Sequence, residues 1–69
     1  MKNWVQKARE ASGLSLEECA SVLLVSPDAF AVKDQNPGTL TLNELRALHN
    51  VFNAEARKIV KEALAEVFV

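Results

Sequence analysis

Signals for the start of a helix recur along this chain at short intervals. Two segments, Ser15–Glu18 and Thr41–Glu44, place a hydroxyl side chain three residues before a glutamate. This spacing is typical of a capping box, in which each side chain accepts a hydrogen bond from the other residue's backbone N–H. Ser26–Pro27 and Asn53 are two further starts, since serine and asparagine cap free N–H groups and proline suits the first helical position. Four such signals in 69 residues restrict the chain to short helices with short connections.

Apolar residues between these signals recur at the three- and four-residue spacing that gives a helix one buried face. Leu16, Cys19, Ala20 and Leu23 form one such stripe, and Gly13 just before it suits the end of the preceding helix. We find no strand-like alternation of apolar and polar residues. The sequence therefore predicts an all-α fold, as one domain over residues 1–69, with five helices near residues 2–12, 15–23, 26–34, 41–49 and 53–68.

The composition is that of a small globular protein, with 49% apolar and 25% charged residues. A formal net charge of −1 is unusual for a nucleic-acid binder, because neutralising phosphates supplies most of the affinity of such proteins. The single Cys19 has no partner for an internal disulfide, which fits a reducing compartment. The first ten residues lack the apolar stretch of a signal peptide, and no apolar run is long enough to span a membrane. We therefore expect a cytoplasmic protein without a membrane partner.

Residues able to carry catalysis are few. Cys19 lies on an apolar stripe, and His49 is the only imidazole in the chain, so a zinc site is not expected. Glu17 and Glu18 are adjacent and diverge around a helix, which disfavours a paired acid and base. The chain also lacks a glycine-rich phosphate loop. We expect neither enzymatic activity, nor a metal or other cofactor, nor a small-molecule substrate.

Taken together, six positions resemble a known family. The pattern is that of phage repressor and Cro-like (XRE-type) helix-turn-helix proteins, which place an arginine, Gly-Leu-Ser, a small residue, an apolar–hydroxyl pair, an acid and a turn in this order. The corresponding positions in this chain are, in the same order, Arg9, Gly13-Leu14-Ser15, Ala20, Val25-Ser26, Asp34 and Asn36. The resemblance implies a five-helix lambda-repressor-like domain. It also implies a phage-related transcription regulator that binds double-stranded DNA with its third helix in the major groove.

The resemblance further implies roles for particular residues. Arg9 and Asp34 would form a structural pair between the first and third helices. Ser15 would contact a phosphate. The residues expected to contact DNA from the third helix and its flanks are Ser26, Asp28, Ala29, Val32, Lys33, Gln35 and Asn36.

The sequence departs from the family pattern where DNA is contacted. The family's recognition helix usually offers arginine, glutamine, serine, threonine or lysine to the bases, whereas this chain has Pro27, Asp28, Ala29 and Val32. The turn before that helix usually contains glycine, and Leu24 stands there, where a left-handed backbone conformation would be strained. An alternative function is therefore a helix-turn-helix fold that serves as a protein–protein interaction module with little or no DNA binding.

The end of the chain carries an apolar stripe that continues past what a domain of this size can cover. Leu64, Val67, Phe68 and Val69 belong to it. An apolar end of this kind is typical of a homodimer seam. We therefore expect a homodimer joined through these residues.

Overall fold

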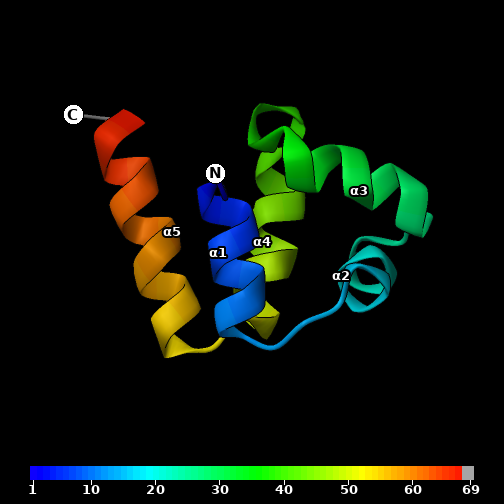
Figure 1. Ribbon diagram of the computed structural model, residues 1–69, viewed down its shortest axis with the longest axis horizontal. Coiled ribbons are helices and arrows are strands. Elements are labelled where there is room, and N and C mark those ends of the chain that lie inside the picture. Colours follow the sequence, from blue (N-terminus) through cyan, green and yellow to red (C-terminus); the bar gives the residue numbers. More distant parts are fainter. Residues whose placement is uncertain (68–69) are drawn as a thin grey trace.

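The computed structural model describes residues 1–67, and the side chains of residues 1–65. The described chain is entirely helical and contains no strand, which confirms the predicted all-α class. Five α-helices and one short 3₁₀ helix follow one another (Figure 1): α1 Trp4–Ala11, α2 Leu16–Leu23, α3 Pro27–Gln35, η1 Pro37–Thr39, α4 Leu42–Val51 and α5 Ala54–Val67.

Each predicted start signal caps a helix. The Ser15 hydroxyl accepts from the backbone N–H of Glu18, and Thr41 does the same for Glu44, so both capping boxes are formed. Ser26 accepts from the N–H of Ala29 at the start of α3. Asn53 accepts from the N–H of Ala56 at 2.8 Å. These local hydrogen bonds explain why the predicted and observed starts of four helices agree within about one residue.

The first helix begins later than predicted because of a cap that the sequence pattern did not indicate. Asn3 accepts from the backbone N–H of Gln6, and the Gln6 side chain accepts from the backbone N–H of Asn3. A glutamine at this position completes a capping box as a glutamate does. Helix α1 therefore starts at Trp4 rather than at residue 2.

The helices form two groups. Helix α1 packs along α5, whereas Figure 1 shows α2 and α3 at the other end of the long axis. Asn53 joins the start of α5 to the end of α1, because its side-chain amide donates to the carbonyl of Ala11 at 2.7 Å and its backbone N–H donates to the Ser12 hydroxyl at 2.9 Å. Helix α2 packs against both α3 and α4, which connects the two groups.

One core passes through both groups. Phe30 of α3 and Leu48 of α4 are its largest fully buried side chains, together with Val5 and Cys19. Burial raises the pKa of the Cys19 thiol to about 11, so this sulfur is protonated at neutral pH and packs as an apolar group. The remaining buried apolar residues are Ala8, Ala20, Phe52, Ala56 and Val60.

Candidate functional site

The first candidate site is the surface formed by α2, the turn after it, and α3. Figure 1 shows α2 almost end-on while α3 runs across the view, so the two helices cross steeply. Ala20 of α2 and Phe30 of α3 belong to the same buried cluster, and the small alanine allows the two backbones to approach. The turn between them contains Leu24, the one non-glycine residue of the described chain with a positive φ, at 59°.

Arg9 and Asp34 form the structural pair expected between α1 and α3. The Nε atom of Arg9 donates to Oδ1 of Asp34 at 3.0 Å, and another guanidinium nitrogen donates to the carbonyl of Leu14, also at 3.0 Å. Asp34 is only 4% exposed, and Asn3 donates to its backbone carbonyl at 2.8 Å. These contacts fix the C-terminal half of α3 against α1, and they therefore help to set the orientation of α3.

The outward side of α3 offers few groups for base contacts. Asp28, Ala29, Val32 and Gln35, which belong to the set expected to contact DNA, are exposed there. Ala29 and Val32 carry no polar side-chain atom, and the Asp28 carboxylate only accepts hydrogen bonds. Only Gln35, at the last turn, has both a donor and an acceptor. This helix therefore offers one residue able to make a bidentate contact with a base.

Two of the residues expected to contact DNA, Lys33 and Asn36, make contacts within the chain instead. The Lys33 ammonium lies 3.1 Å from Oε1 of Glu44 and is largely buried against α4. The side-chain amide of Asn36 donates to the carbonyl of Val32 at 3.3 Å. Because Lys33 is neutralised by Glu44, it adds little positive potential to the surface of α3.

The two serines of this surface also have structural roles. Ser15 Oγ accepts from the N–H of Glu18 at 3.0 Å, and Ser26 Oγ accepts from the N–H of Ala29 at 3.1 Å. Beside them, Glu17 and Glu18 are exposed on α2. With Asp28 at the start of α3, these carboxylates make the α2–α3 surface acidic, which opposes contact with phosphates.

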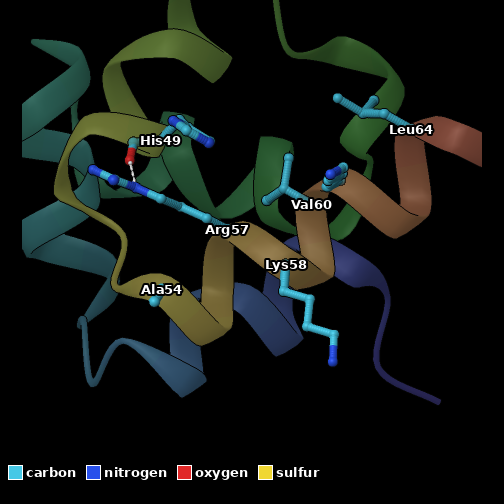
Figure 2. A pocket seen from close by; sticks show the side chains of 7 residues that line it. His49, Ala54, Arg57, Lys58, Val60 and Leu64 are labelled. Carbon is cyan, nitrogen blue, oxygen red and sulfur yellow. Dashed lines mark hydrogen bonds between the residues drawn. The ribbon is translucent and has the colours of Figure 1, made fainter.

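The second candidate site is a groove between α4 and α5 that the sequence analysis did not predict. It consists of two adjoining hollows of about 560 and 280 Å³, which share His49, Val60 and Leu64 in their walls. Figure 2 shows the larger hollow, with Val60 and Leu64 on α5 and His49 on α4. Leu42, at the start of α4, lines the smaller hollow and is 74% exposed.

Arg57 sets one wall of the groove. Its Nε atom donates to the backbone carbonyl of His49 at 2.9 Å (Figure 2), and a second nitrogen donates to the carbonyl of Asn50 at 3.4 Å. These carbonyls belong to the last turn of α4, where a cation is favoured by the helix dipole. Arg57 therefore fixes α5 against the C-terminal end of α4, and the groove is a formed feature rather than a gap between loosely placed helices.

Of the residues expected to form a homodimer seam, only Leu64 has a described side chain. Leu64 lines both hollows and is half-buried. The side chain of Val67 and all of Phe68 and Val69 lie outside the described residues.

Other kinds of site have no support in the described chain. No group of three or more His, Cys, Asp or Glu side chains within it is placed to hold a metal ion. None of its helices combines the length and apolar character needed to cross a membrane. Comparison with family models, with characterised proteins and with solved structures finds no match to this chain.

Proposed function

We propose that this protein is a protein-binding module with a helix-turn-helix arrangement, and that it does not function by binding DNA. The observation that carries this proposal is the distribution of charge. Three exposed carboxylates, Glu17, Glu18 and Asp28, lie on α2 and α3. The single lysine of these two helices, Lys33, is paired with Glu44. A surface of this kind repels a DNA backbone, because phosphate contacts supply nearly all of the non-specific affinity of DNA-binding proteins.

The apolar character of α3 also supports a protein partner. Val32 is 56% exposed and Leu24 is 92% exposed, and Ala29 lies exposed on the same helix as Val32. Apolar side chains on a surface are more useful in a protein interface, whose centre is depleted of charge, than against phosphates.

A Cro/repressor-type transcription regulator is the second candidate function. The steep crossing of α2 and α3, together with the Arg9–Asp34 pair, favours it. In that case α3 would enter the major groove, with Gln35 contacting a base and Asp28 accepting from a cytosine amino group.

The two functions are separated by a salt titration of binding to a labelled random duplex. We expect no saturable binding by the wild-type protein even at low salt. Reversing two exposed charges, with Glu17→Lys and Asp28→Lys combined, should create binding whose affinity falls steeply as salt rises, because two repulsive groups become phosphate contacts. Glu55→Lys with Glu62→Lys on α5 is the matched control, with the same change in net charge on another element.

The wild-type result decides the proposal. Wild-type binding with a steep negative salt dependence would overturn it in favour of the regulator. Equal gains by the α2–α3 pair and by the α5 control pair would also count against it, since the acidic α2–α3 surface would then not be what excludes DNA.

A further inference from the structure

The groove between α4 and α5 has the dimensions of a short helix. Its lining residues run from Leu42 to Asn50 on α4 and from Ala54 to Leu64 on α5. At a rise of about 1.5 Å per residue these two walls are roughly 12 and 15 Å long, and the longer one equals about three helical turns. Both hollows are open to solvent, so a helix can enter the groove from the side.

The floor of the groove is apolar. Leu45 and Leu64 are half-buried in the walls, Val60 lies at the base, and Leu42 extends the strip at the open end. An apolar groove suits a docked helix whose apolar side chains recur at three- and four-residue spacing and act as anchors. Covering Leu42 would remove a large apolar side chain from water, which favours binding.

The rim of the groove is uniformly basic. Arg46 lines it from α4, and Arg57, Lys58 and Lys61 line it from α5, with His49 between them. The described carboxylates of these helices lie elsewhere: Glu55 and Glu62 are not among the lining residues, and Glu44 is paired with Lys33. A partner that fits the groove therefore carries negative charge beside its apolar anchors.

We propose that the groove between α4 and α5 binds an acidic amphipathic helix of about three turns, with apolar residues at three- and four-residue spacing and Asp or Glu on both flanks. This proposal goes beyond the function proposed above, because it assigns a partner to the α4–α5 groove rather than to the α2–α3 surface. A second copy of the chain is a poorer occupant, because two such grooves facing each other would bring like charges together. A nucleic acid is also poorer, because phosphates match the rim but leave the apolar floor uncovered.

The test uses two matched peptides. The first is a fluorescein-labelled synthetic peptide with leucine at the anchor positions and glutamate at the others, and the second has lysine in place of every glutamate. We expect saturable binding of the glutamate peptide to the full-length protein, measured by fluorescence anisotropy, and no binding of the lysine peptide. Absence of saturable binding by the glutamate peptide would overturn the proposal.

Exposed residues of the groove provide the variants. Arg46→Glu and Lys61→Glu should each weaken binding about tenfold, because an attraction at the rim becomes a repulsion. Leu42→Ser should weaken it by a similar factor through loss of apolar burial. Lys7→Glu is the matched control, since Lys7 is exposed on α1 and does not line the groove, and it should leave the affinity within about twofold. Circular dichroism of each variant verifies that the helices are intact.

The remaining outcomes separate this inference from the proposed function. If neither the glutamate peptide nor duplex DNA binds, the inference fails while the exclusion of DNA stands. Wild-type DNA binding that Arg46→Glu and Lys61→Glu abolish but Leu42→Ser does not would make the groove a nucleic-acid surface and would overturn both. Self-association in sedimentation that the same three variants abolish would assign the groove to a second copy and overturn the inference.

Discussion

At the scale of single residues, Leu24 is the clearest point of strain. Its backbone is left-handed, with φ 59° and ψ 39°, and its side chain is 92% exposed, so no packing compensates for the strain. A residue with a Cβ atom loses about 1–2 kcal/mol of stability in the left-handed region. Glycine avoids this strain, but it also raises the conformational entropy of the unfolded chain, which cancels part of the gain.

We therefore expect Leu24→Gly to raise the free energy of unfolding by about 0.5–1 kcal/mol in urea denaturation. Leu24→Ala is the control, because it removes the exposed side chain and keeps the strain. An alanine variant as stable as the glycine variant would show that the backbone conformation is not the cause.

Arg9 and Asp34 make the second residue-scale prediction. Removing one partner leaves the other largely buried without its counter-charge, and we expect Arg9→Met and Asp34→Asn each to cost about 2–4 kcal/mol of unfolding free energy. The double variant should cost clearly less than the sum of the two, with a coupling of more than about 1 kcal/mol. Additive losses in this double-mutant cycle would mean that each side chain acts through its other contacts, those of Arg9 with Leu14 and of Asp34 with Asn3.

At the scale of elements, Glu44 combines two roles at the start of α4. Its carboxylate accepts from the backbone N–H of Thr41 at 2.9 Å and pairs with Lys33 of α3. The hydrogen bond from the Thr41 backbone is the main cause that holds the pKa of Glu44 below its ordinary value of 4.5, and Lys33 lowers this pKa further. The folded state therefore binds this proton less readily than the unfolded state does.

This contribution to stability is present above pH 4.5 and is lost as the pH falls below that value through the lowered pKa. We expect Glu44→Gln to destabilise the protein at neutral pH and to flatten the acid limb of its stability curve, measured by urea denaturation across pH. Lys33→Met should flatten it only in part, because the Thr41 N–H remains. A Glu44→Gln curve parallel to that of the wild type would contradict the assignment.

The elements themselves were largely predictable, because their starts are encoded locally. A capping box needs only four residues, and all four predicted start signals cap helices in the structure. The short helix η1 at Pro37–Thr39 was not predicted, since its hydrogen bonds, including one from the Thr39 hydroxyl to the carbonyl of Asn36 at 2.7 Å, depend on how the chain leaves α3. Phe52 was missed for a similar reason: it lies between two helices, where periodicity gives no indication, yet it is buried.

At the scale of the whole molecule, the groove could not be predicted from the sequence. Its walls come from two helices, and no local pattern shows which face of α4 is left uncovered by α5. The resemblance in the helix-turn-helix segment predicted a site on α3 instead. Arg46, Lys58 and Lys61 look in the sequence like ordinary solvated charges, and only the fold places them around the same two adjoining hollows.

The separation of α2 and α3 from α5 along the long axis gives the molecule an electric dipole that its net charge of −1 conceals (Figure 1). The α2–α3 end is negative, and the positive surplus lies in the rest of the chain. A charged body approaching through solvent exerts a torque on such a dipole before any side chain touches it, over a range of about 10 Å at ordinary salt. Encounters are thereby oriented in advance, and a nearly neutral protein still has association rates that depend on ionic strength.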